Sequence, residues 1–442
     1  MAAMLTITAR LAPVLLFLIA LLPWPAAAGL VKVETATALR GVYLIPDAES
    51  DTVRVSAVFL AGEADSDAPE GLAHYVEHLM FWHADRVSSR AFHSRGGNAW
   101  INGIITTYYN EGPTTELDDL FAFAGRLLTP LSLDASFMRD ERRIVAREYD
   151  LRISENPKRR FREQMNRTLY GANPVGRSVI GTPQTIDAFD LDMAERFRQR
   201  HYVAANMVLL ASGNLSEDTL RRKVEDVFGD VRRGAANAQG WRDAALLDDL
   251  SRTIDATDSR IVSSAYQFSS LSHWTGSGDR LQDMYTIGFL AELLGSSLPG
   301  GLAKPLTIND FVVSTFHVRL DWKLRDQIQF YFQARPDEGV APETVAAKLH
   351  ESLVALADSG VPERSVERIR KRFTQEAARR GEEPDYILGR AMRNLTAGLD
   401  PNDPADHLQR IATVTKADID RLIRAVTDRH RYVEVNLTQE GS

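Results

Sequence analysis

The sequence predicts an α+β fold of two similar domains, each an antiparallel-type sheet with helices packed on one face. Three observations lead to this prediction. The 442 residues are too many for one ordinary hydrophobic core. Segments with strand-like alternation are interspersed with segments of helical spacing along the chain. The order of these segments in the first half recurs in the second, which indicates an ancient duplication.

The first 28 residues have the layout of a secretory signal peptide. Arg10 is their only charged residue, an apolar run covers residues 11–22, and the small residues 26–28 follow it. A membrane anchor is the alternative, but this run is short against the ~20 residues that a helix needs to cross a bilayer. We therefore expect cleavage after Ala28 and export across the inner membrane, into the periplasm if the source is a Gram-negative bacterium.

The first half after this leader contains predicted strands and helices in a mixed order. β-Branched alternation between turn residues predicts the strands, and apolar spacing predicts the helices. The strands are 31–47, 52–62, 98–109 and 207–213, and the helices are 69–82, 116–128, 134–154, 191–201 and 217–228.

The boundary between the halves is predicted from a change of composition. Residues 232–259 are rich in Ala, Gly and Asp and have weak periodicity, so we place the boundary there, which gives domains 29–243 and 244–442. The second half contains predicted strands at 260–268, 311–320 and 327–336, helices at 278–294, 344–358 and 363–379, and a loop at 295–305.

Charge and cysteine content exclude several kinds of protein. The formal net charge is −8 and no basic stripe is concentrated anywhere, so neither nucleic acid nor an anionic lipid surface is an expected partner. After the leader, no stretch is long and apolar enough to predict a membrane span. The chain has no cysteine. Any bound metal must therefore be held by His, Asp or Glu.

The informative motif lies in the predicted helix 69–82. His74 and His78 are four residues apart, so both rings project from one helix face and can share one metal ion. Glu77 lies beside both rings, where a carboxylate can take a proton from an attacking water. Such a pentapeptide also arises by chance, as two unrelated histidines.

A catalytic zinc site usually takes a third protein ligand. Glu141 and Glu148, seven residues apart on the predicted helix 134–154, point to one side and are candidates. A charged helix face laced with arginines is the alternative interpretation. His83 and His93 are the competing ligands, the first off the metal face and the second in a loop.

The sequence resembles the pitrilysin/insulinase family of zinc peptidases, whose motif is the inverted H-x-x-E-H. Four more segments carry the resemblance. The string ERRIVARE (141–148) is similar to the downstream ligand helix of the family, and Gly97-Asn98-Ala99 is similar to its edge strand. Residues 176–181 and 197–207 resemble the pattern that follows the metal site.

The resemblance implies a zinc metalloendopeptidase with one Zn²⁺ per chain. It makes His74, His78 and Glu148 the zinc ligands. Glu77 becomes the general base, and Glu141 a carboxylate behind the ligands that steadies the site.

The same resemblance implies how a substrate binds. Asn98 and Ala99 would lie on a strand edge where an extended peptide or an unfolded segment adds a strand by β-augmentation. The zinc site then belongs to domain 29–243, and domain 244–442 is metal-free.

The resemblance also implies a partner, because members of this length typically pair two subunits, as a homodimer or as a heterodimer with a related peptidase-like subunit. One departure bears on this. The family usually offers an arginine and a tyrosine from the second half, whereas here Lys304 is the only cation near Leu302 and no tyrosine follows.

Three functions stay open at this point. The first is a zinc peptidase to which a partner subunit supplies the missing arginine and tyrosine. The second is a catalytically weak or inactive peptidase-like subunit or scaffold. A zinc hydrolase of other substrates on a different fold is the third.

Overall fold

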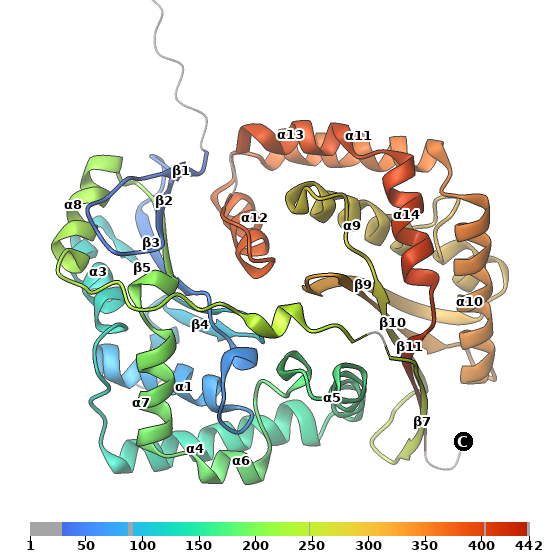
Figure 1. Ribbon diagram of the computed structural model, residues 1–442, viewed down its shortest axis with the longest axis horizontal. Coiled ribbons are helices and arrows are strands. Elements are labelled where there is room, and N and C mark those ends of the chain that lie inside the picture. Colours follow the sequence, from blue (N-terminus) through green and yellow to red (C-terminus); the bar gives the residue numbers. More distant parts are fainter. Residues whose placement is uncertain (1–28, 87–91, 247, 402–403, 440–442) are drawn as a thin grey trace, which may run out of the picture.

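The computed structural model describes residues 29–86, 92–246, 248–401 and 404–439. The predicted signal peptide, residues 1–28, lies outside the described residues. Two halves of similar build lie side by side, each a sheet with helices (Figure 1). Among the described residues, no helix combines the length and the apolar character that crossing a membrane requires.

The first sheet has the strand order β1-β2-β6-β3-β5-β4. Its pairs are antiparallel except β2 with β6, which run parallel. The strands are β1 Val31–Lys32, β2 Gly41–Pro46, β3 Thr52–Phe59, β4 Asn98–Ile101, β5 Thr106–Pro113 and β6 Met207–Gly213. β4 therefore lies at one end of the sheet.

The second sheet repeats this topology. Its order is β7-β11-β8-β10-β9, and again one pair is parallel, here β7 with β11, the counterparts of β2 and β6. The strands are β7 Leu250–Asp258, β8 Ala265–His273, β9 Val313–Leu324, β10 Gln327–Pro336 and β11 Arg431–Gln439. β9 thus corresponds to β4. The predicted two-domain α+β fold is confirmed, and the structure adds that both sheets are mixed.

The helices follow the strands in the same order in both halves. Helix α1 comes after β3 and α9 after β8, so α9 is the counterpart of α1. In the first half the helices are α1 Leu72–Asp85, α3 Leu117–Arg126, α4 Ala135–Tyr149, α5 Pro157–Tyr170, α6 Pro183–Ala188, α7 Leu191–His201 and α8 Glu217–Phe228. In the second half they are α9 Arg280–Gly295, α10 Pro342–Ser359, α11 Glu363–Arg380, α12 Pro384–Thr396, α13 Pro404–Thr413 and α14 Lys416–Thr427.

One helix from each half packs against the sheet of the other half. Helix α5 packs against β8 and β11, and α12 packs against β2 (Figure 1). Met165 and Leu169 of α5 are fully buried in a cluster with Val433 of β11. Ala391 of α12 is buried beside Tyr43 of β2. Both faces of each sheet are therefore covered, one by helices of its own half and the other by a helix from across the molecule.

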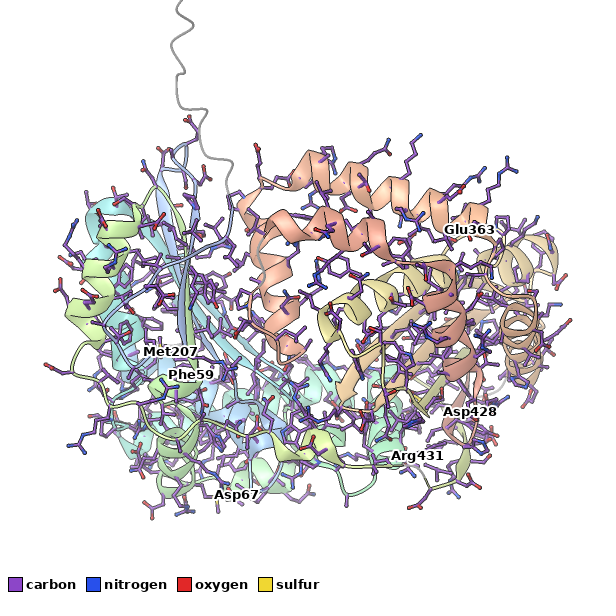
Figure 2. All side chains as sticks on the ribbon, turned by 45° about the horizontal axis from the view of Figure 1, so that its top comes forward. Phe59, Asp67, Met207, Glu363, Asp428 and Arg431 are labelled. Atoms are coloured by element: carbon purple, nitrogen blue, oxygen red, sulfur yellow. The ribbon has the colours of Figure 1, made fainter. Side chains whose placement is uncertain are left out.

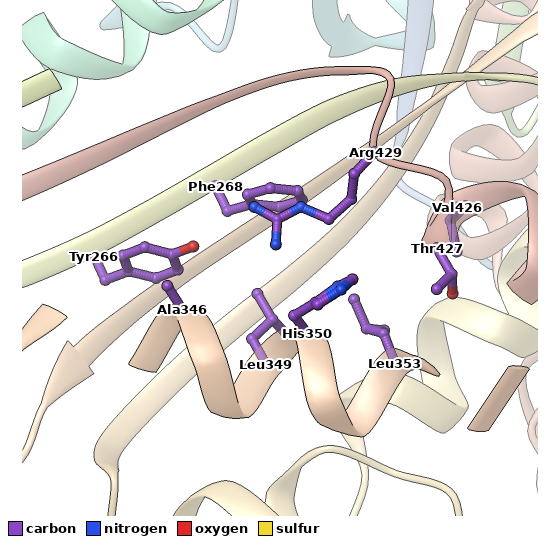
Figure 3. Close-up of a pocket in the computed structure, with 9 residues that line it drawn as sticks. All are labelled: Tyr266, Phe268, Ala346, Leu349, His350, Leu353, Val426, Thr427 and Arg429. Carbon is purple, nitrogen blue, oxygen red and sulfur yellow. The ribbon is translucent and has the colours of Figure 1, made fainter. Parts of the chain in front are cut away.

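The hydrophobic core of each half is densely packed. In the first sheet Phe59 and Met207 are paired across β3 and β6 and are fully buried (Figure 2). In the second, Leu349 of α10 lies close to Phe268, and the guanidinium of Arg429 lies 5.2 Å from the centroid of that ring (Figure 3). The space enclosed there is about 10 Å³, room for one water at most. This region is core packing.

The structure corrects several predicted elements. Residues 98–109 form a hairpin, β4 and β5, because the side chain of Asn102 accepts hydrogen bonds from the amides of Ile104 and Ile105 at 2.7 and 2.9 Å and turns the chain. Strand β7 lies inside the stretch expected to be the irregular boundary. A π-helical turn, Lys304–Asn309, lies at the end of the expected loop and beyond it. The strand expected at 260–268 is β8, five residues later in the chain. The exact domain boundary stays a prediction.

The packing of α5 on the sheet of the second half leads to a stability prediction. Leu169→Ala should lower the free energy of unfolding by about 2–5 kcal/mol, because it opens a cavity where α5 meets the second sheet. Urea unfolding followed by fluorescence measures the change. Leu151→Ala, at a side chain that is 53% exposed, is the matched control. A loss no larger than that of the control would contradict the packing role of α5.

Candidate metal centre

Helix α1 begins at a tightly packed turn. Gly71, just before it, has φ +93°, and a Cβ there would lie 2.5 Å from the carbonyl oxygen of Ile180. The buried carboxylate of Glu63 accepts hydrogen bonds from the amides of Gly71 and Ala73 at 2.9 and 3.2 Å. A carboxylate on these first amides satisfies donors that have no partner inside the helix. The start of α1, and with it His74, is thereby fixed.

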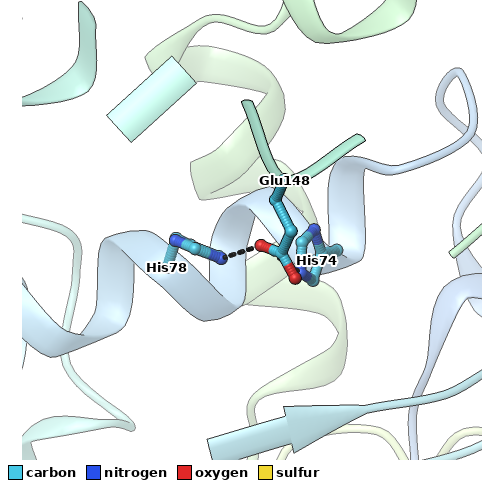
Figure 4. A group of neighbouring side chains, drawn as sticks. All are labelled: His74, His78 and Glu148. Carbon is cyan, nitrogen blue, oxygen red and sulfur yellow. Dashed lines mark ion pairs between the residues drawn. The ribbon is translucent and has the colours of Figure 1, made fainter. Parts of the chain in front are cut away.

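Helix α4 brings the third group of the site. Glu148 lies near its end, and its Oε2 is 3.7 Å from Nε2 of His74 and 3.3 Å from Nε2 of His78 (Figure 4). Its other oxygen pairs with Arg152 at 2.8 Å. Arg152 belongs to a π-helical turn, Asp150–Ser154, that continues α4. The structure therefore gathers His74, His78 and Glu148 from two helices.

The three groups match the donor set of a zinc site. One ligand atom from each lies within 4.8 Å of the others, and both histidines are buried. Ligands at about 2.0–2.1 Å from a tetrahedral zinc are about 3.3 Å apart. The separation of Glu148 from His78 agrees with that spacing and that from His74 is somewhat longer, so the donor set and its placement are compatible with zinc.

Glu141 lies on the far side of the His78 ring from Glu148. It is 1% exposed, and its Oε2 is 3.1 Å from Nδ1 of His78. A proton held on Nδ1 by this carboxylate leaves Nε2 of His78 free to bind a metal. By contrast, Nδ1 of His74 has no hydrogen-bond partner among the described residues.

The carboxylates of Glu141 and Glu148 stabilise a positive charge near the imidazole rings of His74 and His78. Burial lowers the pKa of His74 to about 3. Burial also opposes the charged form of His78, but hydrogen bonds to Glu141 and Glu148 outweigh it and raise the pKa to about 10. Burial opposes ionisation of Glu148 too, yet the hydrogen bond with His78 and the neighbouring positive charges lower its pKa to about 2. A divalent cation would supply the charge that this arrangement stabilises.

Glu77 lies on the open side of the group. Its Oε2 is 3.8 Å from Nε2 of His74, and burial raises its pKa to about 7. The side chain lines a cleft of about 690 Å³ together with Asn98 and Ala99 of β4. His93 borders the same cleft, and its Nε2 is hydrogen-bonded to Oδ1 of Asn98. A carboxylate with a raised pKa beside a metal site can accept a proton from water.

Two other residues considered from the sequence lie elsewhere. Both ring nitrogens of His83 are used in other contacts, with Thr129 at 3.0 Å and with the amide of Ser132 at 3.1 Å. Lys304 is exposed on a π-helical turn that packs against α10 and β9, and it does not line the cleft of the metal site.

The second half has a cavity at the corresponding place. It measures about 460 Å³ and is lined by α9, β9 and α11, the counterparts of α1, β4 and α4. Met284, Ile287 and Gly288 of α9 face it with the spacing that His74, Glu77 and His78 have on α1. Among the described residues only His74, His78 and Glu148 form a group able to hold a metal. The duplicated fold, as far as the structure describes it, therefore has a metal-binding group in its first half and none in its second.

The position of Glu141 leads to a prediction about metal affinity. Glu141→Gln should weaken zinc binding about 10–100-fold, because the amide no longer fixes the proton on Nδ1 of His78. Competition with a chromogenic chelator measures the affinity. Asp140→Asn, at an exposed neighbour on the same helix, is the control. Equal affinity in both variants would show that Glu141 does not orient the ligand.

Comparison with known proteins agrees with this geometry. Residues 42–183 match the family model "Insulinase (Peptidase family M16)", and residues 188–373 match "Peptidase M16 inactive domain". The chain is 26% identical over 220 residues to the probable mitochondrial-processing peptidase subunit beta of Schizosaccharomyces pombe, an alignment that covers 48% of each protein. The match thus spans about half the length of that curated relative.

Two solved structures show the same fold. A protease from Helicobacter pylori superposes with a TM-score of 0.79 at 17% identity, over 92% of this chain and 99% of that one. The periplasmic protease PqqL from Escherichia coli superposes with a TM-score of 0.73 at 16% identity, over 92% of this chain and 47% of PqqL. With the two family models in consecutive segments and this architecture throughout, the chain belongs to the M16 (insulinase/pitrilysin) peptidase family.

Proposed function

We propose that the chain is a zinc metalloendopeptidase that hydrolyses extended peptides or unfolded protein segments. One observation carries the proposal. His74, His78 and Glu148 converge at one point, and Glu77 lies beside them in a cleft that reaches the edge strand β4. Metal ligands, a base and a peptide-binding edge are the parts that peptide hydrolysis requires.

The metal would be held by His74, His78 and Glu148. Zinc bound there supplies Lewis-acid chemistry, which polarises a carbonyl and acidifies water. Glu77 takes the proton of the attacking water and passes it to the leaving amine. Glu141 holds the ring of His78, and Arg152 holds Glu148 through its second oxygen. The protein thus contributes positioning and proton transfer.

The substrate would lie along β4. This strand ends the sheet order, and Asn98 and Ala99 line the cleft of the metal site. A peptide that pairs with the free edge of β4 extends past Glu77. Its binding then depends mainly on hydrogen bonds of its backbone and less on its side chains. A folded protein cannot present such a strand without local unfolding. This is the basis for the preference for extended segments.

The general base is tested by Glu77→Gln. The variant should keep its zinc and lose peptide hydrolysis by about 10²–10⁴-fold, because an amide cannot accept the proton. Metal analysis and cleavage of a quenched peptide measure the two properties, and Glu217→Gln, at an exposed position on α8, is the control. Removal of zinc by a chelator should abolish cleavage, and added zinc should restore it.

The alternative function, an inactive peptidase-like subunit or scaffold, has its own outcome in this experiment. A wild-type protein that binds no zinc would establish it. Full activity of zinc-loaded Glu77→Gln would instead show that the mechanism is wrong.

We further propose that the chain works with a second chain of the same fold and that it is exported. It corresponds to about half of PqqL, a periplasmic protease, and Lys304 does not reach the metal cleft. A second copy or a related subunit would close a chamber over the site and offer the missing donors to the substrate carbonyl.

Native mass spectrometry of the protein purified from its own source tests this pairing. We expect a dimer, either of two copies or of this chain with a related subunit, and peptidase activity that falls on dilution as the dimer dissociates. A monomer whose specific activity does not change with concentration would contradict it.

A further inference from the structure

A second cleft joins the metal site to the second half of the chain. It measures about 650 Å³ and lies between α5, β9 and α12. It shares five lining residues with the cleft of the metal site, and Arg159 is the charged one among them. A peptide bound at β4 and continuing toward the second half must therefore pass Arg159.

This interdomain cleft is rich in positive charge, although the whole chain carries −8. Six cationic side chains and three acidic ones line it. The cations are Arg159, Arg162, Arg177, Arg319, Lys323 and Arg393, and the acids are Glu63, Glu163 and Asp321. Like charges gathered in a cleft with walls of low dielectric constant attract ligands of opposite charge.

The acidic side chains of this cleft are mostly engaged. Asp321 pairs with Arg319 at 2.8 Å and lies 3.8 Å from Lys323. Glu63 caps α1, where its two oxygens accept hydrogen bonds from the amides of Gly71 and Ala73, and burial raises its pKa to about 8. Glu163 is half-buried, and burial raises its pKa as well. The remaining cations keep their charge for a ligand.

Two arginines face the cleft without a partner. Within the described residues, the side chains of Arg159 and Arg393 form no ion pair and no hydrogen bond, from α5 on one side and α12 on the other. Arg159 is half-buried, and burial together with the charge of Arg162 lowers its pKa. A partly desolvated guanidinium that lacks a partner gains more from binding a carboxylate than an exposed one does.

We propose that this cleft selects peptides with an acidic side chain close to the scissile bond, and that Arg159 binds that carboxylate. The inference rests on the proposed peptidase function and names its substrate class. Arg393 lines this cleft but not the cleft of the metal site, so it favours a second acidic residue at a greater distance from the bond. Arg159 acts here as a specificity-determining residue, apart from the proton transfer.

Matched quenched peptides test the proposal. Peptides of one sequence carry Glu, Gln or Lys at each position near the cleaved bond, and kcat/KM is measured at low and high salt. At one position, the Glu peptide should be cleaved about tenfold more efficiently than the Gln peptide, the size expected for one charge-assisted pair. High salt should reduce this ratio.

Variants of Arg159 assign the effect to one side chain. Arg159→Gln should bring the Glu/Gln ratio close to one, Arg159→Lys should retain part of it, and Arg159→Glu should favour the Lys peptide. Arg196→Gln is the matched control, because Arg196 is exposed on α7 and lines neither cleft. A ratio near one in the wild type, or one that Arg159→Gln leaves unchanged, would overturn the proposal.

A binding experiment separates this inference from the proposed function. Zinc-loaded Glu77→Gln should bind a labelled Glu peptide about tenfold more tightly than the Gln peptide in fluorescence anisotropy, and adding Arg159→Gln should remove the difference. Equal affinities would overturn the inference even if the wild type cleaves both peptides. Preferential binding without any cleavage by the wild type would support the selection of acidic peptides by this cleft and refute the proposed peptidase function.

Discussion

The reciprocal packing of α5 and α12 fixes the two halves of the chain relative to each other. Each of these helices buries apolar side chains on the sheet of the other half, as Leu169 does beside Val433 and Ala391 beside Tyr43. The same two helices form opposite walls of the interdomain cleft. The width of that cleft, and the separation of Arg159 from Arg393, are therefore set by core packing and not by flexible loops.

One continuous segment links this packing to the metal centre. Helix α4 carries Glu141 and Glu148, the π-helical turn after it carries Arg152, and α5 carries Arg159. A π-helical turn shifts the helix face by an extra residue per turn, and such turns are frequent at functional sites. Here it lies between the part of the segment that binds His78 and the part that packs on the second sheet. This turn therefore joins the helix that carries Glu148 to the helix that packs on the second sheet.

Much of the fold and the centre of the site could be predicted, because both depend on local patterns. The spacing of His74 and His78 is a property of one helix, and the strands alternate clearly. Helix α5 was missed although Asn156 and Pro157 are a strong helix start, and the Asn102-Gly103 turn was missed inside a predicted strand. The charge of the interdomain cleft could not be predicted, because whether Arg159 finds a partner depends on residues distant in sequence.

Within the part of the chain that the structure describes, one half holds a metal-binding group and the other does not, although the two share a topology. Both halves keep a cavity between the helix after the third strand, the strand at the end of the sheet and a later long helix, since this hollow is a consequence of the topology. In the first half the hollow is lined by imidazoles and carboxylates, whose desolvation a bound cation would help to offset. In the second, Met284 and Ile287 face it at no such cost. The second half contributes in other ways. Its sheet packs against α5, and its β9 and α12 line the interdomain cleft where the substrate is proposed to bind.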